Sequence, residues 1–309
     1  MPAKAKTGKT VKAKKEDIAV ENVPAQESVQ PEQKVAQPVP VQAAPEVVVV
    51  PKKKILFVAS EATPFIATGG LAEVIGSLSK ALAVNENYDV RVVIPLYSDI
   101  SWEYRNKFKY LGNIFVPLAW RNQYCGIFSY EKDNVTFYFI DNEYYFKRPG
   151  CYGYYDDGER FAFFCRSVME IMPFLNFYPE IMHCHDWQAA LVPVYLRTLF
   201  KDSPVGRAKS ILTIHNLRFQ GVYNIPTIKY WSGLPDSVFN MGALQQDYVE
   251  ANMLKGGLAY ADRITTVSGT YAAEIQTPEY GERLEDHLRY HNWKLRGIVN
   301  GIDYEMWDP

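Results

Sequence analysis

The stretch KILFVASEATPFIATGGLAEVIGSLSKAL, residues 54–82, joins an apolar run to an amphipathic one through a turn with two glycines. Residues 54–60 are apolar and end in a polar turn, which is typical of a strand buried on both faces of a sheet. Helical spacing then appears at five apolar positions: Leu71, Val74, Ile75, Leu78 and Leu82. The stretch therefore predicts a strand, a tight turn and a helix, which is the first unit of an α/β fold.

Further strands and helices alternate along the chain in the same way. Apolar runs predict strands at 89–97, 180–186, 209–216 and 263–268. Helices are predicted at 160–175, at 187–200 with Asp186 as the N-cap, and at about 246–260. Aromatic and polar residues alternate over 104–141, which predicts β-hairpins. Together these units predict an α/β protein with a doubly wound, mostly parallel Rossmann-like sheet and a β-hairpin insertion.

Residues 1–53 differ in composition from the rest of the chain. No aromatic residue occurs up to Lys54, whereas seven of the 19 prolines do. Residues 1–54 have ten Lys against six Asp and Glu, a charge of +4, so residues 55–309 carry −6 of the total of −2. Such a segment buries too little apolar surface to offset the entropy of ordering, so we expect a disordered tail followed by one folded domain, residues 54–309. No aromatic side chains interleave with its lysines for base stacking, so no nucleic-acid partner is expected.

The start of the chain does not match a targeting signal. No apolar segment of secretory type follows the charged residues, and the apolar run at 45–51 is too short to span a bilayer. A plastid leader would be rich in Ser and Arg, whereas this tail has one Ser and no Arg. We therefore expect a cytoplasmic protein without a membrane partner. The chain has four cysteines without a CxxC pair, which are expected to be reduced and mostly buried: Cys125, Cys151, Cys165 and Cys184.

Three polar motifs follow predicted strands: ATGGL (67–71), HCHDWQ (183–188) and HNLRFQG (215–221). Ligands of doubly wound sheets bind beyond the carboxyl ends of the strands, so these motifs are predicted to form one site. The glycine turn matches neither GxGxxG nor GxxxxGK[ST], so neither dinucleotide nor P-loop chemistry is indicated. The turn either lets backbone N–H groups approach an anion or serves only as a tight connection.

The two histidines of HCHDWQ have a structural and a functional interpretation. His185 is predicted to face the ligand crevice, and His183, on the same side of the strand, is predicted to lie deeper. Alternatively, both are core histidines with satisfied hydrogen bonds. A third ligand at suitable spacing is missing, so no metal site is expected.

Other polar residues near these motifs also have two interpretations. His215 and Asn216 either bind sugar hydroxyls or cap a loop. Asp156 and Asp157 are interpreted as helix-start charges near Arg160. A tyrosine cluster either stacks on a sugar or packs an ordinary surface: Tyr152, Tyr154 and Tyr155. A GxSxG elbow or Ser-His-Asp order is missing, so a site for phosphate and sugar explains more of these signals than a hydrolase site does.

Nine segments in order carry a family resemblance: KILFVASEATPF, TGGLAEVIGSLSKAL, VVIPLY, YGYYDDGERFAFF, HCHDWQAALVPVYL, TIHNLRFQGVY, NMLKGGLAYADRITTVS, YAAEIQTPEYG and NGIDYEMWDP. From Lys54 to Pro309 the chain resembles the amino-terminal domain of bacterial glycogen synthase and plant starch synthase. This resemblance implies a GT-B enzyme, in which two Rossmann-like domains face each other across a cleft. The given chain would be the first of the two, with the second expected after residue 309.

The resemblance also implies the reaction and its partners. Glucose would pass from ADP-glucose to the non-reducing end of an α-1,4-glucan such as glycogen, with retention and without a metal or other cofactor. The expected partners are therefore ADP-glucose, a glucan primer and the second GT-B domain. Because that domain would hold most contacts to the adenosine and diphosphate, the given chain alone is expected to be inactive.

The family's site residues map onto matching positions. The resemblance places the nucleotide phosphates at the glycine loop, which we define as residues 67–70: Ala67, Thr68, Gly69 and Gly70. It implies that His185 contacts the transferred glucosyl group as the catalytic residue, and that Asn252 lines the sugar and acceptor region. Tyr97 and His215 are expected near the same cleft.

Two departures from the family pattern leave questions open. The family commonly has Lys where this chain has Ala67, and many relatives have Asp where it has Lys147. Losing a charge-assisted contact weakens phosphate binding unless another cation substitutes. Three alternatives therefore stay open beside the ADP-glucose enzyme: use of UDP-glucose, a plastid starch synthase, and a glucan-binding module without catalysis. A Rossmann oxidoreductase is disfavoured because the first turn lacks GxGxxG.

Overall fold

The computed structural model describes residues 51–305, 307 and 308, so the predicted disorder of 1–53 lies almost wholly outside the described residues. A nine-stranded sheet runs through the fold in the order β11-β10-β7-β6-β1-β2-β5-β4-β3. Its strands are β1 Lys53–Val58, β2 Tyr88–Pro95, β3 Lys109–Leu118, β4 Arg121–Lys132, β5 Val135–Asp141, β6 Ile181–His185, β7 Lys209–Ile214, β10 Arg263–Thr266 and β11 Leu295–Gly297. A separate antiparallel pair consists of β8 Val222–Asn224 and β9 Glu250–Asn252.

The predicted sheet type and its insertion are confirmed. All neighbours from β11 to β5 pair in parallel, whereas β5, β4 and β3 pair antiparallel as the hairpin region. The chain builds β2 on one side of β1 and later β6 on the other, so the direction of sheet growth reverses at β1. Ligands of doubly wound sheets bind at such a switch point. In β1, Leu56, Phe57 and Val58 are fully buried, as expected for a central strand covered on both faces.

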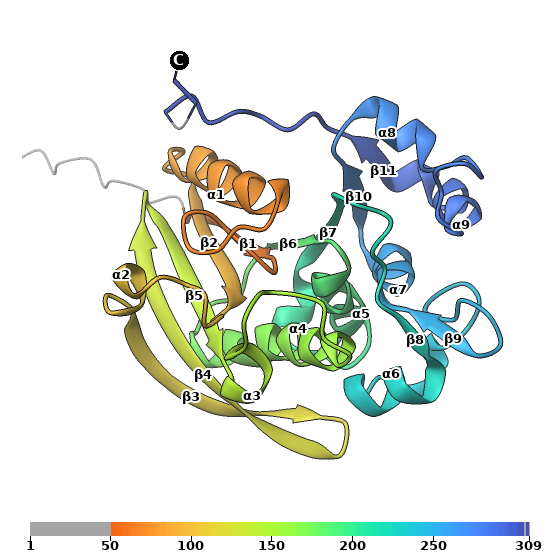
Figure 1. Cartoon of the computed structure of the whole chain (residues 1–309), viewed down its shortest axis with the longest axis horizontal. Helices are drawn as coiled ribbons and strands as arrows, with labels where there is room; N and C mark the ends of the chain where they lie inside the picture. The colour runs from red at the N-terminus through yellow and green to blue at the C-terminus, as the bar shows by residue number, and fades with distance from the viewer. Residues whose placement is uncertain (1–50, 306, 309) are drawn as a thin grey trace, which may run out of the picture. The chain divides into compact units, whose positions relative to one another are not determined.

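Nine α-helices occur within the described residues: α1 Gly70–Ala83, α2 Trp102–Arg105, α3 Glu143–Phe146, α4 Asp157–Phe174, α5 Leu191–Arg197, α6 Ile225–Ser232, α7 Met253–Tyr260, α8 Gly269–Glu274 and α9 Glu285–Tyr290. Helix α1 lies on one face of the sheet, and α4 and α5 lie on the other (Figure 1). None of the helices in the described ranges has the length and apolarity that a membrane crossing requires.

Two predicted helix starts are wrong. Residues 187–189 form a 3-10 turn and the regular helix α5 begins only at Leu191, so Asp186 precedes the 3-10 turn and is not the N-cap of the α-helix. Asp186 has a φ of 55° and its carboxylate accepts no cap hydrogen bond; it binds the loop after β7 instead. The helix predicted from residue 246 begins at Met253, because 250–252 pair with β8. There the side chain of Asn252 caps α7 by accepting from the Lys255 N–H at 2.9 Å.

The four cysteines are buried and free, as predicted. Burial raises the pKa of Cys125, Cys151 and Cys165 to about 12, and raises that of Cys184 well above its usual value. Thiolates are the reactive form, so the folded chain is expected to react with no measurable equivalent of a thiol reagent at pH 7.5. Four equivalents are expected in denaturant. Fast reaction of any one thiol in the folded chain would contradict this burial.

Candidate functional site

A cavity of about 860 Å³ lies at the carboxyl ends of the central strands. The residues that line it are Glu61, Thr68, Gly69, Gly70, Leu71, Tyr152, Gly153, Asp157, Asp186, Trp187, Gln188, His215, Asn216, Phe219, Val267 and Asn300. All three predicted motifs contribute, so the structure brings them together at one cavity, as the strand order predicted. The parallel sheet brings them together because β1, β6 and β7 end at the same edge.

The glycine loop meets the cavity at the start of α1. Gly69 is the N-cap and provides no side chain to cap the helix, so the first backbone N–H groups of α1 are left for a ligand. A Cβ built at Gly69 or Gly70 would meet nothing within 4 Å, which shows open space on this side of the loop. The partial positive charge at a helix N-terminus favours an anion there.

A buried carboxylate that the sequence analysis did not single out holds this loop. Glu61 follows β1, is 4% exposed, and accepts hydrogen bonds from the Thr68 N–H and from Thr68 Oγ1, the latter at 3.0 Å. The Tyr152 hydroxyl donates to Glu61 Oε1 at 3.1 Å and contacts Ser60 Oγ at 2.6 Å. The signal in the sequence was an acidic residue directly after a buried apolar strand. Tyr152 uses its hydroxyl for this network.

Three histidine rings contact one another in sequence at one wall of the cavity: His183, His185 and His215. His185 Nδ1 is 3.0 Å from His215 Nε2, and His183 Nε2 is 2.6 Å from Thr213 Oγ1. His215 lines the cavity, whereas His185 is fully buried, stacks on Phe57, and has an Nε2 without a partner among the described residues. The prediction that His185 faces the crevice and that His183 lies deeper is wrong, because His185 is fully buried and outside the cavity lining, whereas His183 is only partly buried.

These imidazoles are neutral at pH 7. Burial lowers the pKa of His183 to about 3 and that of His215 to about 4, and burial lowers the pKa of His185 well below its usual value. A neutral imidazole donates one hydrogen bond and accepts one. His215 can therefore bind a hydroxyl group of a ligand while its other ring nitrogen is paired with His185.

Asp186 connects β6 to the loop after β7. Its Oδ1 accepts from the His215 N–H at 2.7 Å and more weakly from the Asn216 N–H at 3.4 Å, so it shapes the loop that presents His215. Burial raises the pKa of Asp186 to about 7, although the two backbone hydrogen bonds act in the opposite direction. This carboxyl group lines the cavity beside Gln188, whose Oε1 is buried without a partner among the described residues.

The start of α4 and the residues before it form another part of the cavity wall. Asp157 accepts from the Gly153 N–H at 2.8 Å and the Tyr154 N–H at 3.2 Å, and pairs with the fully buried Arg160. Asp156 pairs with Arg148 at 2.7 and 2.8 Å. The interpretation of both aspartates as helix-start charges beside arginine is confirmed. Arg148 and Arg160 pair with these aspartates, and neither arginine is among the residues that line the cavity.

Three of the predicted site residues line the cavity from the glycine loop, namely Thr68, Gly69 and Gly70, and His215 joins them. Ala67 is exposed but is not in the lining. Tyr97 is fully buried, and its hydroxyl has no hydrogen-bond partner in the part of the chain that the structure describes. Asn252 is fully buried too, and its amide group caps α7 and donates to Gln220 at 2.6 Å. The structure therefore does not bring Tyr97 and Asn252 into the cavity wall.

The described residues that line the cavity include acidic groups but neither Lys nor Arg. Lys147, the other departure from the family pattern, is exposed and pairs with Glu143 at 2.9 Å. Within the described ranges, no group of three or more His, Cys, Asp or Glu is placed to hold a metal ion. What the cavity offers a ligand is therefore backbone N–H groups for an anion, and amide, carboxyl and imidazole groups for hydroxyls. Asn300 belongs to this set and was missed, although it follows β11 at the same sheet edge.

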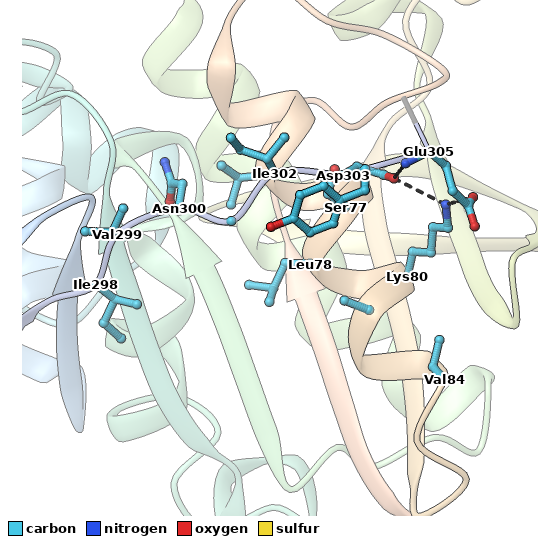
Figure 2. Close-up of a pocket in the computed structure, with 14 residues that line it drawn as sticks. Ser77, Leu78, Lys80, Val84, Ile298, Val299, Asn300, Ile302, Asp303 and Glu305 are labelled. Atoms are coloured by element: carbon cyan, nitrogen blue, oxygen red, sulfur yellow. Dashed lines mark hydrogen bonds and ion pairs between the residues drawn. The ribbon is translucent and has the colours of Figure 1, made fainter. Parts of the chain in front are cut away.

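A second, smaller cavity of about 420 Å³ lies on the outer side of α1. Residues 298–305 run back across this helix, and Lys80 contacts Asp303 at 3.3 Å and Glu305 at 2.5 Å (Figure 1, Figure 2). Apolar side chains form most of its wall, among them Leu78 and Ile302 (Figure 2). Its charged side chains pair with one another, whereas polar groups from several strand ends converge on the larger cavity, which is therefore the candidate site.

Comparison with known proteins gives the family to which this chain is similar. Residues 54–290 match the family model described as "Starch synthase catalytic domain". The chain is 51% identical over 259 residues to a protein named glycogen synthase from Lachnospira eligens and 50% identical over 258 residues to one from Lactobacillus acidophilus. Each match covers 83% of this chain and 54% of the relative, so the chain spans about half the length of these curated relatives.

One solved structure adds a likeness in fold. The catalytic domain of starch synthase IV from Arabidopsis thaliana, bound to ADP and acarbose, matches with a TM-score of 0.78 and 28% sequence identity. The match covers 83% of this chain and 53% of that one.

Proposed function

This chain belongs to the starch synthase catalytic domain family, and from that premise we propose that the protein it forms part of is a glycogen synthase. In this proposal the enzyme transfers glucose from ADP-glucose to the non-reducing end of an α-1,4-glucan, with retention and without a metal, in the cytoplasm. The support comes from the family match, from relatives of about 50% identity with that name, and from a structural neighbour bound to ADP and acarbose.

One observation carries the proposal: an anion-binding helix start and hydroxyl-binding side chains line the same cavity. A nucleotide sugar needs both, because its diphosphate seeks N–H donors and its glucosyl group offers only hydroxyls. In the proposed complex, the N–H groups at Gly69 and Gly70 bind the diphosphate. His215 and Asn216 bind the glucosyl hydroxyls, and Asp186 fixes the loop that presents them.

Two further parts of the proposed site are the role of His185 and the source of cations for the diphosphate. His185 holds His215 through the 3.0 Å contact between their rings, and so acts on the glucosyl group through His215. Cations for the diphosphate would come from the half of the relatives' length that this chain does not span, since the described lining has none. The same half would set the choice between ADP-glucose and UDP-glucose.

The proposal predicts a clear contrast between two proteins. A full-length protein containing this chain is expected to incorporate labelled glucose from ADP-glucose into glycogen, faster than from UDP-glucose and equally well after chelation of divalent metals. The 309-residue chain alone is expected to incorporate none above background, because the diphosphate is left without cations.

Incorporation of radiolabel into precipitated glycogen, with the product anomer identified by NMR, measures these outcomes. Glucose transfer by the isolated chain would contradict the proposal that both halves of the protein are needed to bind ADP-glucose. Binding of maltooligosaccharides by the full-length protein without any glucose transfer would instead favour a glucan-binding module.

A further inference from the structure

We propose that Glu61 is a positioning residue that holds the glycine loop open toward the cavity, so that a nucleoside diphosphate meets preorganised N–H groups. The identity of this ligand rests on the proposed function; the anchoring of the loop rests on the geometry alone. Glu61 touches no reacting atom in this proposal, and acts through Thr68.

The first step is that both oxygens of the Glu61 carboxylate accept hydrogen bonds from a single loop residue, Thr68. Oε2 accepts from the Thr68 N–H, and Oε1 accepts from Thr68 Oγ1 at 3.0 Å. Paired hydrogen bonds to a buried carboxylate are stronger than bonds between neutral groups and fix orientation as well as distance. Glu61 is itself held at the end of β1 and is 4% exposed, so the loop is tied to the central strand of the sheet.

The second step is that the anchor extends across the fold. Oε1 of Glu61 also accepts from the Tyr152 hydroxyl at 3.1 Å, and that hydroxyl lies 2.6 Å from Ser60 Oγ. Tyr152 belongs to the segment that leads into α4, and this segment also lines the cavity. The Glu61 carboxylate therefore joins two segments that line the cavity, the glycine loop and the segment before α4.

The third step is that little else defines the loop. Residues 67–70 are all exposed, and the space beside Gly69 and Gly70 is open. Glycine loses more conformational freedom on ordering than other residues, so a loop with two adjacent glycines needs an external restraint. Because Thr68 uses both its N–H and its hydroxyl on Glu61, and the Ala72 N–H donates to the Gly69 carbonyl, the donors left for a diphosphate are the N–H groups of Gly69, Gly70 and Leu71.

Glu61→Gln tests this role, because glutamine has the same shape but no charge and only one acceptor oxygen. In the full-length protein we expect the KM for ADP-glucose and the Kd for ADP to rise about tenfold, with a much smaller change in kcat. In hydrogen exchange without ligand, we expect faster exchange at residues 67–71 and unchanged exchange in β1. Thr68→Val, which keeps the N–H bond and removes the hydroxyl, is expected to give a smaller change in the same direction.

Glu131→Gln, on the exposed side of β4, is the matched control and is expected to change none of these quantities. Unchanged loop exchange in Glu61→Gln, or faster exchange spread evenly over β1 and α1, would overturn the positioning role. So would faster loop exchange with unaltered KM and Kd. If the wild-type protein does not turn over ADP-glucose at all, the proposed function fails, and the exchange data on the unliganded loop still decide whether Glu61 anchors it.

Discussion

Arg160→Met is expected to destabilise the folded chain by about 3–5 kcal/mol, because it leaves a buried carboxylate without its cation. Arg160 is fully buried and donates to the Tyr145 carbonyl at 2.7 Å and the Cys151 carbonyl at 3.2 Å, besides pairing with Asp157. Methionine fills similar volume but replaces none of these hydrogen bonds. Asp157 is only 6% exposed, so water solvates its charge poorly even though the residue lines the cavity.

The chain contains a matched control for this change. Arg289 and Asp286 form a pair with the same i,i+3 spacing, but their side chains are 48% and 88% exposed. Exposed pairs contribute less than about 1 kcal/mol, so Arg289→Met is expected to have little effect. Urea denaturation of both variants, followed by circular dichroism, measures the difference. Equal destabilisation would contradict the view that Arg160 matters through its buried pairing.

A second large effect is expected on acidification, where the free energy of unfolding should fall by several kcal/mol between pH 7 and pH 5. All five histidines of the chain have a lowered pKa in the folded state, chiefly because they are buried: His183, His185, His215, His287 and His291. The unfolded chain takes up these protons near its ordinary pKa of about 6.5, whereas the folded chain does not. The stabilising contribution of these histidines is therefore complete above pH 6.5 and is lost as the pH falls toward their lowered folded pKa values, which are about 3 for His183 and His287 and about 4 for His215 and His291.

The size of this effect follows from the pKa difference. At pH 5, each histidine that stays neutral in the folded state lowers the free energy of unfolding by about 2 kcal/mol, because this effect grows by about 1.4 kcal/mol for each pH unit below 6.5. Asp186 acts in the opposite direction, because its folded pKa of about 7 lies above its unfolded value of 3.8. Protonation of Asp186 below pH 7 therefore stabilises the fold and offsets about one of the five histidines. The net change remains a loss.

Chemical denaturation at pH 7.5, 6.0 and 5.0 measures this dependence. His287 and His291 lie on or next to α9 and are not in the cavity lining, so the double substitution of both by Gln separates the effect from the site. We expect the double variant to lose less stability than the wild type over the same pH interval, whatever its stability at pH 7.5. Stability that stays constant from pH 7.5 to 5.0 would contradict the neutral, buried state of these histidines.

The order of strands and turns followed from the sequence because it depends on local pattern. The apolar run at 54–60, the helical spacing after Gly70 and the alternation over 104–141 each report burial within one segment. Placing ATGGL, HCHDWQ and HNLRFQG at one edge needed only the general rule that parallel strands end on the same side. The same rule, applied to NGID after β11, would also have found Asn300.

Other features were decided only by the tertiary structure, because they depend on contacts between segments far apart in the chain. Glu61 became an anchor through Tyr152, 91 residues later, and Asp186 became a loop holder through His215, 29 residues later. Local pattern predicted that Asp186 caps a helix, but in the folded chain its carboxylate lies at the end of β7 and accepts hydrogen bonds from the His215 and Asn216 N–H groups. Similarly, the sequence placed two histidines on one face of β6, but only packing against Phe57 and β7 decided that His185 lies beneath the wall and His215 in it. Side-chain hydrogen bonds of buried groups must be satisfied by whatever the fold brings near, and no single segment contains that information.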